Sequence, residues 1–338
     1  MIISRTPFRI SFFGGGTDYP DWYRDNGGQV VGTTIDKYCY IALRRLPPFF
    51  SHRHRFVYSR IEMVSEVAEI EHPAIRAVLQ EYPPEHGLEV HHDGDVPARS
   101  GIGSSSAFTV GLLNALQTLN GITLSPPELA AEAIRIEQDV AHEAVGSQDQ
   151  VWAAHGGLNV IRFGADGRIE VTPLDLSAGR LAALNDRLML FFTGLTRTAS
   201  QIAAQQIGNI PQRRAELREI MAQVDSAVRI LGDEEGDLQA FGRLLHETWQ
   251  VKRRLAEAIT TDFVDDLYDR ARNAGALGGK LLGAGGGGFM LLYVEPEHAP
   301  AVRHALQDIL EIPIRINSIG STIVLNQPDG LGNAPART

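Results

Sequence analysis

The sequence has few of the features that mark secreted, membrane-spanning and nucleic-acid-binding proteins. Its 338 residues include one cysteine, Cys39, so no disulfide can form within the chain and a reducing compartment is expected. No apolar run approaches the roughly 18 residues that a membrane span needs, and the N-terminus lacks the apolar stretch of a signal peptide. The net charge is -10, which gives no basic surface for phosphate backbones. We therefore expect a cytoplasmic protein whose partners are neither nucleic acids nor membranes.

The length of the chain favours two domains, because single hydrophobic cores rarely grow beyond about 250–300 residues. The composition shifts near residues 175–187, and we place the boundary there. The expected order is an N-terminal domain over 1–180, a C-terminal domain over 181–326 and a disordered tail over 327–338. Strands and helices are mixed in both domains without regular alternation, which predicts an α+β fold. The sequence leaves open whether the chain forms a homo-oligomer.

β-branched and aromatic residues predict strands in the first hundred residues, and helical periodicity then takes over. A helix over 104–119 ends at Asn120-Gly121, a common C-terminal signal. Another begins at Ser125-Pro126-Pro127-Glu128, which has the form of a capping box, and is expected to run to about Ala144. The stretch from Arg197 to about Ala274 is almost wholly helical. Strands are predicted at Ile2–Phe13, Val30–Leu43, Arg55–Ser59, Leu88–His92, Leu158–Phe163, Ile169–Thr172, Leu188–Thr193, Phe289–Val294 and Ile319–Leu325, and a last helix at Pro300–Leu310.

A glycine- and serine-rich segment, residues 97–107, leads from a predicted strand into a predicted helix. Glycine lets the backbone approach a ligand closely, and the helix start offers unpaired N–H groups at the positive end of its dipole. The segment therefore suits a triphosphate, and a surface loop with a serine cap is the alternative. A Walker loop is absent from the sequence, and the Rossmann-like glycines at 283–288 precede a strand instead of a helix. The predicted ATP-binding residues are Pro97, Arg99, Ser100, Gly101, Ile102, Gly103, Ser104, Ser105 and Ser106.

Two further glycine-rich segments place this loop in a family context. Residues 5–18, RTPFRISFFGGGTD, end a strand with a sharp turn and a carboxylate, and residues 280–289 carry a run of glycines. Residues 97–107 resemble the motif P-x-x-x-G-L-G-S-S-A-A, with Ile102 for Leu and Ser106 for the first Ala. Together the three segments resemble the GHMP kinases over about residues 2–326. The resemblance implies an N-terminal α/β domain that holds the nucleotide, a C-terminal ferredoxin-like domain with added helices, and an active site between them.

The resemblance also assigns chemistry to residues whose patterns alone do not reveal it. It implies ATP and Mg²⁺ as cofactors, with Ser105 and Glu137 holding the metal. Taken alone, Glu137 would be assigned to the solvent-facing side of a helix. Asp149, which follows the helix break at Gly146, is expected to be the general base toward a sugar hydroxyl. Arg9 is expected to stabilise the developing alkoxide and the γ-phosphate, and a surface strand residue is the alternative.

Three short segments, Gly14–Asp18, Gly146–Gln150 and Thr193–Arg197, narrow the resemblance to one branch of the family. They are similar to the D-glycero-D-manno-heptose 7-phosphate kinases, with the L-fucose kinase domain as a close second. This implies phosphorylation of the anomeric hydroxyl of a sugar phosphate, giving a 1,7-bisphosphate for nucleotide-activated heptose and surface glycans. Another free-sugar 1-kinase and a non-catalytic relative are the alternatives. The expected substrate-binding residues are Gly15, Gly16, Thr17, Asp18, Asp36, Lys37, Gly285, Gly286 and Arg197, and for Arg197 a structural ion pair is an equal alternative.

Overall fold

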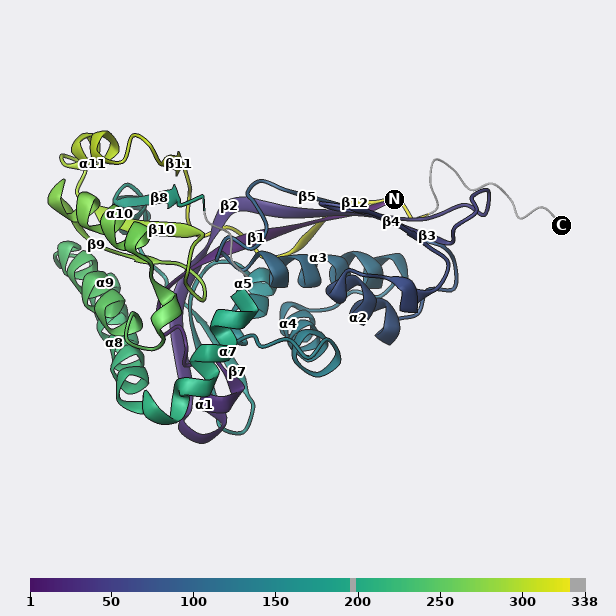
Figure 1. The fold of residues 1–338 in the computed structure, drawn as a ribbon, viewed down its shortest axis with the longest axis horizontal. Coiled ribbons are helices and arrows are strands. Elements are labelled where there is room, and N and C mark those ends of the chain that lie inside the picture. The colour runs from purple at the N-terminus through teal and green to yellow at the C-terminus, as the bar shows by residue number, and fades with distance from the viewer. Residues whose placement is uncertain (195–198, 329–338) are drawn as a thin grey trace.

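The computed structural model describes residues 1–194 and 199–328, which form two parts side by side along the long axis of the molecule (Figure 1). Within these residues the first part contains an eight-stranded sheet and the second a four-stranded sheet, each with its own helices. The expected α+β class is therefore confirmed. Arg197 and positions 329–338 of the expected tail lie outside the described residues.

The larger sheet is built from β1 (Ile2–Phe13), β2 (Gly28–Arg45), β3 (His54–Val57), β4 (Ile61–Val64), β5 (Leu88–Gly94), β6 (Leu158–Phe163), β7 (Ile169–Pro173) and β12 (Thr322–Asn326). The strand order is β12-β1-β2-β5-β3-β4, with β6 and β7 attached at β2. The long strand β2 pairs with β1 along one edge, and successive parts of its other edge pair with β6 and β5. These pairs are antiparallel, whereas β3 runs parallel to β5.

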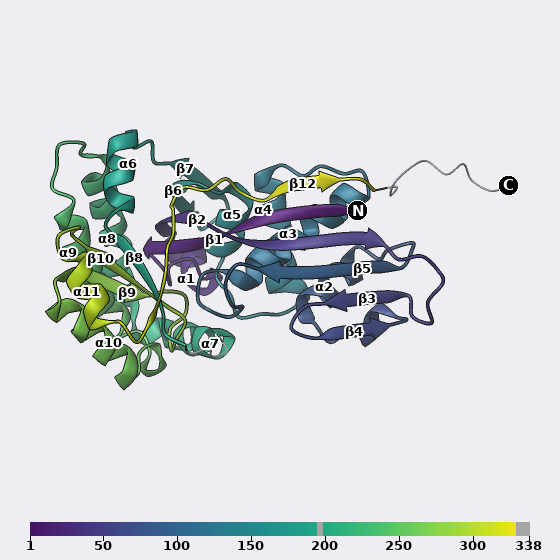
Figure 2. The ribbon, with the colours of Figure 1, turned by 90° about the horizontal axis from the view of Figure 1, so that it is seen from above.

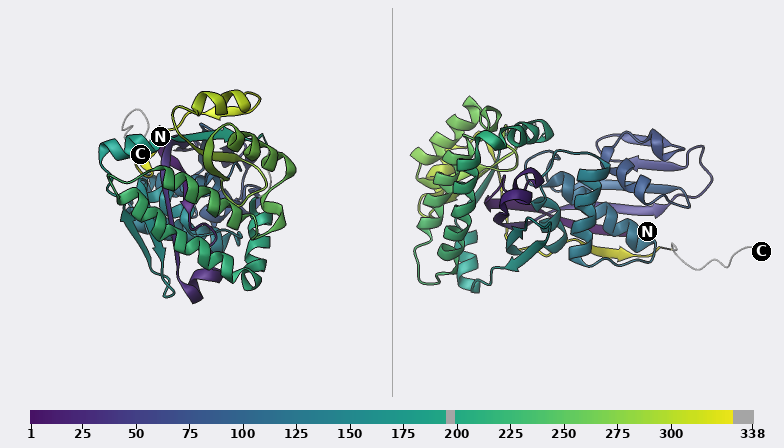
Figure 3. Two further views of the ribbon diagram at one scale, coloured as in Figure 1. Left: turned by 90° about the vertical axis from the view of Figure 1, so that its left-hand side faces the viewer. Right: turned by 90° about the horizontal axis from the view of Figure 1, so that it is seen from below.

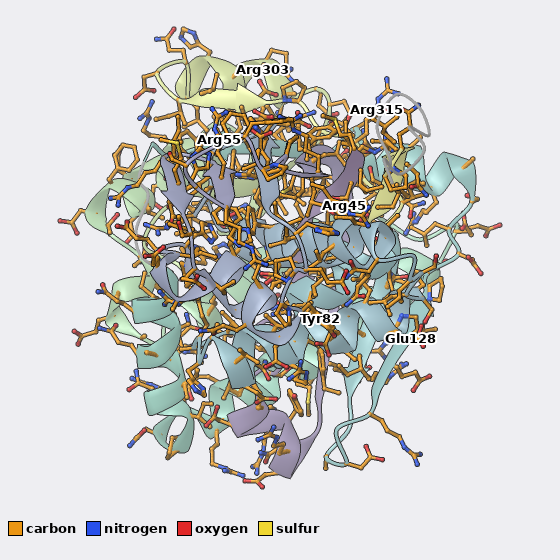
Figure 4. The ribbon with its side chains drawn as sticks, turned by 90° about the vertical axis from the view of Figure 1, so that its right-hand side faces the viewer. Arg45, Arg55, Tyr82, Glu128, Arg303 and Arg315 are labelled. Carbon is orange, nitrogen blue, oxygen red and sulfur yellow. The ribbon has the colours of Figure 1, made fainter. Side chains whose placement is uncertain are left out.

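Four helices of the first part cover one face of this sheet. They are α2 (Pro73–Glu81), α3 (Ser104–Leu119), α4 (Pro126–Arg135) and α5 (Gln148–His155), whereas α1 (Pro20–Asn26) lies apart from this layer, at the bottom of Figure 1. Figures 1 and 3 show α3 beneath the strands with α2, α4 and α5 beside it, and Figure 2 shows the strands from the opposite face. In Figure 4, Arg45 and Arg55 lie at the level of the sheet, and Tyr82 and Glu128 lie in the helix layer below it.

The helix α3 is fixed to the sheet by a close backbone contact. The hydroxyl of Ser4 in β1 donates a hydrogen bond to the carbonyl oxygen of Gly111 at 2.8 Å. A Cβ atom at Gly111 would lie 2.9 Å from the hydroxyl oxygen of Thr6, so glycine allows the helix to lie this close. The contact holds the start of α3, where the predicted phosphate-binding residues lie, in a fixed relation to β1.

The second part has a ferredoxin-like sheet, as the resemblance implies. Its strands are β8 (Leu188–Phe192), β9 (Ala276–Leu281), β10 (Phe289–Val294) and β11 (Leu310–Ile312). Their order in the sheet is β11-β8-β10-β9, and all neighbouring strands are antiparallel. Along the chain, helices lie between β8 and β9 and between β10 and β11, as in a ferredoxin-like fold. The helices of this part are α6 (Ala178–Asn185), α7 (Ala199–Asn209), α8 (Arg214–Gly232), α9 (Gln239–Lys252), α10 (Asp262–Asn273) and α11 (Ala299–Ala305).

The last strand of the chain returns to the first sheet. β12 pairs antiparallel with β1, and isolated bridges join Ile35 to Ile316 and Gly156 to Ile319. The expected C-terminal domain over 181–326 therefore needs a correction at its end, because its last strand completes the edge of the N-terminal sheet. The cause is a backbone pairing between distant segments, which local sequence patterns do not encode.

Two predicted helices end earlier than expected. The helix that begins at Ser125 leaves α-helical geometry after Arg135, and a π-helical turn over Ile136–Val140 replaces the expected continuation to Ala144. The helix predicted at Pro300–Leu310 ends at Ala305, and Leu310 instead begins β11. Pairing of β11 with β8 overrides the local helical preference there. The short elements α1, α2, α5, α6, β4 and β9 were not predicted.

Aromatic side chains join the two parts where β1 meets α9. The rings of Phe12 and Phe13 lie 5.3 and 5.1 Å from the ring of Phe241, both edge to face. All three side chains are buried in a continuous apolar core. Edge-to-face aromatic contacts add to the stabilisation from burial, so the end of β1 is firmly held against the second part. Within the described residues, no helix is both long enough and apolar enough to cross a membrane.

Candidate active site

The phosphate loop, defined here as residues 97–106, precedes and begins α3. Gly101 and Gly103 have φ values of 84° and 73°, in the left-handed region that favours glycine. The hydroxyl of Ser100 donates to the carbonyl oxygen of Pro97 at 2.6 Å and tightens the turn. The first N–H groups of α3 have no helical acceptor, as at every helix start, so the loop can bind an anion. Of the predicted residues, Pro97, Arg99 and Ser105 are exposed, Gly101, Gly103 and Ser104 are half-buried, and Ser100, Ile102 and Ser106 are buried.

A bidentate ion pair between Arg9 and Asp149 lies beside the phosphate loop. The Nε and Nη2 atoms of Arg9 donate to the two carboxylate oxygens of Asp149, both at 2.7 Å. The third guanidinium nitrogen, Nη1, donates to the carbonyl oxygen of Gly101 at 2.7 Å. The side chain of Asp149 is 23% exposed and that of Arg9 is 6% exposed. The carboxylate of Asp149 is therefore accessible from solvent, whereas the guanidinium of Arg9 that orients it is buried.

Gly103 allows the loop to approach this ion pair. A Cβ atom at this position would lie 3.1 Å from Cγ of Arg9 and 3.4 Å from Oδ2 of Asp149. The close contact and the positive φ both require a residue without a side chain. The structure thus brings together the predicted base, the predicted cation and the predicted phosphate loop.

Asp18 lies in the same cluster of charges, at a deeper position. It is 2% exposed, and one of its carboxylate oxygens accepts a hydrogen bond from the backbone N–H of Gly16 at 2.9 Å. Burial raises the pKa of Asp18 to about 6, and the negative charge of Asp149 adds to the rise. A Cβ atom at Gly146 would lie 1.9 Å from Oδ2 of Asp18, so the break before α5 makes room for this carboxyl group.

The turn that carries Asp18 uses its threonine internally. The buried hydroxyl of Thr17 donates toward the carbonyl oxygens of Gly14 and Gln29, at 2.8 and 2.9 Å, and accepts from the N–H of Gln29. These bonds join the turn to the start of β2. Thr17, which was expected to bind substrate, is thus engaged in holding the turn. Gly15 lies near the amide of Gln148, and Gly16 lies against Leu217 and Leu255.

Glu137 is buried beneath the phosphate loop. Its Oε2 atom accepts hydrogen bonds from the hydroxyl of Ser106, at 2.9 Å, and from the side-chain amide of Gln150. Its Oε1 atom is buried without a hydrogen-bond partner. Burial raises the pKa of Glu137 to about 7. The serine on this carboxylate is Ser106, one position after the predicted metal ligand Ser105.

The π-helical turn over Ile136–Val140 contains Glu137. The N–H of Ala141 donates to the carbonyl oxygen of Ile136, five residues back, at 2.8 Å. Turns of this kind occur frequently at functional sites, because the extra residue changes the direction of a side chain. Sequence periodicity did not predict this turn, and it did not identify Ser106 or Gln150 as partners of Glu137.

Asp36 and Lys37 lie in β2, and Asp36 contacts the returning C-terminal segment. The ammonium nitrogen of Lys37 is 3.2 Å from Oδ1 of Asp36. The same oxygen accepts a hydrogen bond from the backbone N–H of Arg315 at 2.8 Å, and Figure 4 marks Arg315 at the upper edge of the molecule. Asp36 therefore joins β2 to the segment that leads into β12, a structural role that was not predicted.

The glycine run at 283–288 packs against the phosphate loop. A Cβ atom at Gly283 would lie 2.5 Å from Cα of Gly101, and one at Gly288 would lie 2.2 Å from the carbonyl oxygen of Ser100. Both glycines have positive φ. The two glycine-rich segments thus interlock backbone against backbone, and the second part of the molecule determines where the phosphate loop lies.

The next two glycines of the run, Gly285 and Gly286, were expected to bind substrate. The structure places both against the loop before α10. The N–H of Gly286 donates to the carbonyl oxygen of Ile259 at 2.8 Å, and a Cβ atom at Gly285 would lie 2.7 Å from Cα of Ile259. Their observed contacts therefore fix the shape of the run.

Two buried lysines of the second part complete the charged cluster. Lys252, the last residue of α9, donates to the carbonyl oxygens of Leu281 and Gly283 at 2.9 and 2.6 Å. Lys280 of β9 donates to two carbonyl oxygens of β1. Burial, reinforced by the positive charge of Arg9, lowers the pKa of Lys252 to about 7. Burial, with the charges of Lys252 and Arg9, also holds the pKa of Lys280 well below its usual value. Sequence patterns gave Lys280 only as the start of a motif and did not identify Lys252.

Comparison with known proteins identifies the family. Residues 65–157 match the GHMP kinases N terminal domain, and residues 226–312 match the GHMP kinases C terminal domain. The chain belongs to the GHMP kinases. The first matched segment carries the phosphate loop, Glu137 and Asp149, and the second carries the glycine run and both buried lysines.

Among GHMP kinases the chain is similar to a D-glycero-alpha-D-manno-heptose 7-phosphate kinase of Campylobacter jejuni. The two are 28% identical over 305 residues, which cover 87% of this chain and 90% of that protein. A bifunctional fucokinase/GDP-fucose pyrophosphorylase of Arabidopsis thaliana is 25% identical over 335 residues, covering 92% of this chain. The match spans 31% of that longer protein.

A solved structure confirms the fold of this GHMP kinase. The crystal structure of a D-glycero-D-manno-heptose 1-phosphate kinase from Bacteroides thetaiotaomicron superposes with a TM-score of 0.76. The alignment covers 95% of this chain and 98% of the other, at 24% identity. The two-part architecture expected from the three glycine-rich segments is thus that of solved GHMP kinases.

Proposed function

We propose that this GHMP kinase transfers the γ-phosphoryl group of ATP to the anomeric hydroxyl of D-glycero-D-manno-heptose 7-phosphate. The observation that carries the proposal is the Arg9–Asp149 pair, which a hydrogen bond from Arg9 to Gly101 holds against the phosphate loop. Phosphoryl transfer to a hydroxyl needs a positioned base beside a triphosphate site. Similarity to the Campylobacter jejuni kinase, over 90% of that protein, supports the choice of sugar. The reaction would take place in the cytoplasm, where Cys39 stays reduced.

In the proposed reaction Asp149 accepts the proton of the sugar hydroxyl. A carboxylate offers about four lone-pair sites, and Arg9 occupies one on each oxygen, so an acceptor site remains. The hydroxyl oxygen forms a bond to the γ-phosphorus while the bond from this phosphorus to the β,γ-bridging oxygen breaks. That oxygen leaves with ADP, and the products are the sugar 1-phosphate and ADP. Arg9 and the N–H groups that begin α3 stabilise the charge on the transferred group.

The residues around Glu137 fit a magnesium ion. The buried Oε1 atom without a partner is a carboxylate oxygen available to a metal, and Ser105 and Ser106 bring hydroxyls to the same helix start. Within the described residues no group of three or more His, Cys, Asp or Glu side chains could hold a metal. Magnesium needs no such group, because one carboxylate, substrate phosphates and water complete its shell. When bound, Mg²⁺ would neutralise charge on the phosphates.

The sugar would bind on the side of Asp149 that faces away from Arg9. We propose that Asp18 accepts hydrogen bonds from sugar hydroxyls, with the backbone of Gly15 and Gly16 lining the approach. Arg197, which lies outside the described residues, is proposed to bind the distal phosphate with a guanidinium fork. Lys37 is proposed to add a positive charge at the same end.

A free-sugar 1-kinase acting on L-fucose is the second candidate. The observation in its favour is the match to the Arabidopsis thaliana fucokinase, which extends over 92% of this chain. The same base and phosphate loop would serve both reactions, because both substrates present an anomeric hydroxyl, and of the two only the heptose carries a phosphate at the far end. The distal phosphate therefore separates the two candidates.

An ADP-release assay over a panel of acceptors tests the proposal. With ATP and Mg²⁺ present, we expect kcat/KM for heptose 7-phosphate to exceed that for L-fucose, galactose and mevalonate by at least about a hundredfold, since a matched charged group is worth several kcal/mol. Phosphorus NMR of the product should show the new phosphate on the anomeric carbon. A higher kcat/KM for L-fucose would favour the second candidate, and turnover of mevalonate alone would contradict both.

A further inference from the structure

Lysine is rare in this chain, and its positions are informative. Lys37, Lys252 and Lys280 are the three lysines among 31 lysine and arginine residues, so arginine supplies nearly all cations. Lys252 and Lys280 are both buried, at 7% and 3% exposure. An ammonium group is compact and can lose its proton on burial, whereas a guanidinium keeps its charge. A chain that uses arginine almost everywhere else therefore keeps lysine at two interior positions of the charged cluster.

Lys252 lies at one end of a series of contacts, and the proposed base, Asp149, lies at the other end. Its ammonium donates to the carbonyl oxygens of Leu281 and Gly283, which flank the start of the glycine run. Gly283 packs against the backbone of Gly101. The carbonyl oxygen of Gly101 accepts a hydrogen bond from Arg9, whose other two nitrogens hold Asp149. Four direct contacts thus connect the end of α9 to the carboxylate that would take the proton.

The carboxylates around Lys252 are too few to balance the positive charges of the cluster. Its neighbours in the cluster are Arg9 of β1, Asp18 after β1 and Lys280 of β9, and Asp149 of α5 pairs with Arg9. With every group ionised, three cations would face two carboxylates. Two of the three ammonium donors of Lys252 are occupied by backbone carbonyls, and these do not neutralise its charge. An arriving phosphate group would supply the missing negative charge.

We propose that Lys252 is a positioning residue for phosphoryl transfer, which holds the glycine run against the phosphate loop and adds positive charge beside Asp18 when an anionic substrate binds. The inference rests on the proposed kinase function and adds a residue from the second part to it. Loss of the ammonium would release the carbonyl of Gly283, loosen the contact with Gly101 and misalign the Arg9–Asp149 pair. The effect falls on the transition state, since the phosphate loop itself stays on α3.

Two substitutions separate the hydrogen bonds of Lys252 from its charge. Lys252→Met keeps the length of the side chain and removes both properties, whereas Lys252→Gln keeps an N–H donor and removes the charge. We expect each to lower kcat by at least about thirtyfold while KM for ATP changes less than about threefold. The matched control is Arg254→Met, which removes an exposed cation two residues away, and its kcat should equal that of the wild type. Full turnover in Lys252→Gln would overturn the role of the charge, and full turnover in Lys252→Met would overturn the proposal.

The pH profile provides a readout that a purely structural residue would not change. Burial holds the pKa of Lys252 near 7 in the free protein, so kcat/KM of the wild type, which reports ionisation of the free protein, should fall as Lys252 loses its proton above about pH 7. In Lys252→Met this fall should be absent. The titration of Glu137 is common to both proteins and cancels in the ratio of their kcat/KM values, whereas Asp18 interacts with the charge of Lys252, so the ratio reports these two groups together. A ratio that does not depend on pH would overturn the proposal.

Proton uptake on binding of an ATP analogue tests the role of Lys252 without a measurement of turnover. At about pH 7.5 a neutral Lys252 should take up a proton when a non-hydrolysable ATP analogue binds, because the phosphate charge favours the ammonium form. Calorimetry in two buffers of different ionisation enthalpy measures this uptake, which should be smaller in Lys252→Met than in Arg254→Met. Equal uptake in both overturns the role of Lys252. A wild type that binds the analogue but phosphorylates no sugar contradicts the proposed function instead.

Discussion

In the proposed reaction Asp149 accepts the proton and Glu137 holds the metal, and the surroundings of these two carboxylates are opposite. Asp149 is accessible to solvent and is held by both nitrogens of a guanidinium fork. Glu137 is buried, and burial raises its pKa to about 7 although hydrogen bonds from uncharged side chains act in the opposite direction. The first environment keeps a carboxylate oriented and open to a substrate. The second leaves one carboxylate oxygen buried without a hydrogen-bond partner.

In this site, different features determine the orientation of one carboxylate, Asp149, and the charge of the other, Glu137. A guanidinium in direct contact fixes where the lone pairs of Asp149 lie, whereas burial decides whether Glu137 carries a charge at all. Asp149 should therefore respond to any change in geometry, and Glu137 should respond to changes in pH and in metal concentration.

The largest effect is expected from Asp149→Asn. The amide cannot accept the proton of the sugar hydroxyl, so kcat should fall by at least about a hundredfold. Calorimetry should show nearly unchanged binding of the ATP analogue and of the sugar, because the phosphate loop is intact. Asp166→Asn, which alters an exposed aspartate in the β6–β7 turn, is the control and should retain full turnover. Turnover retained by Asp149→Asn would remove Asp149 from the role of base.

Glu137→Gln should have a smaller effect on turnover and a distinct effect on the metal requirement. The amide is a weaker ligand than a carboxylate, so we expect kcat to fall about tenfold and the half-saturating Mg²⁺ concentration to rise. Activity measured against magnesium concentration tests this. Glu71→Gln, which alters a side chain that is 70% exposed, should leave the magnesium curve unchanged. An unchanged curve in Glu137→Gln would exclude Glu137 from the metal site.

Glu137→Gln should also change how the free energy of unfolding depends on pH. The pKa of Glu137 is raised from 4.5 to about 7, so between these values the folded protein binds more protons than the unfolded one. Its contribution is fully present below about pH 4.5 and is lost as the pH rises through about 7. Each pKa unit corresponds to about 1.4 kcal/mol. Urea unfolding should therefore show that Glu137→Gln gains stability over the wild type, by roughly 2–3 kcal/mol, between about pH 5 and about pH 8.

Gly103→Ala should have the smallest effect, and it tests the geometric side of the comparison. The new Cβ atom would press on Cγ of Arg9 at 3.1 Å, so kcat should fall about fivefold through misalignment of Asp149. Gly121→Ala has a similar positive φ of 78° and meets nothing within 4 Å. Both variants should lose about 1 kcal/mol of stability through backbone strain, measured by urea unfolding, and the control should keep full turnover. Equal kcat values in the two variants would contradict the proposed contact.

The phosphate loop and the helix that follows it could be predicted from the sequence, because local rules determine them. Glycines at 101 and 103 are needed for positive φ, and the helix over 104–119 begins and ends where its signals lie. The capping box at Ser125 and the hairpin of β6 and β7 followed from similar rules. These features depend on residues within a few positions of one another.

The rest of the site depends on contacts between distant segments, and sequence patterns did not reach it. Lys252 ends an amphipathic helix, where a lysine is normally expected at the surface, and only packing against β9 buries it. Ser106 instead of Ser105 contacts Glu137, because Ser106 lies on the buried side of α3 and Ser105 is exposed. Asp36, expected to line the sugar site, contacts Arg315 through a return of the chain that no local pattern encodes.

The pairing of β12 with β1 affects how the protein folds during its synthesis. β1 carries Arg9, and one of its edges is completed by β12, so a sheet begun at Ile2 acquires its outer strand when Asn326 has been made. Pairing over such a separation is slow, since a very long loop must close first. A ribosome-bound chain would therefore hold the unpaired edge of β1 exposed for most of its synthesis. The strand that orients the base is thus protected late, and chaperones that shield strand edges would act on this stage.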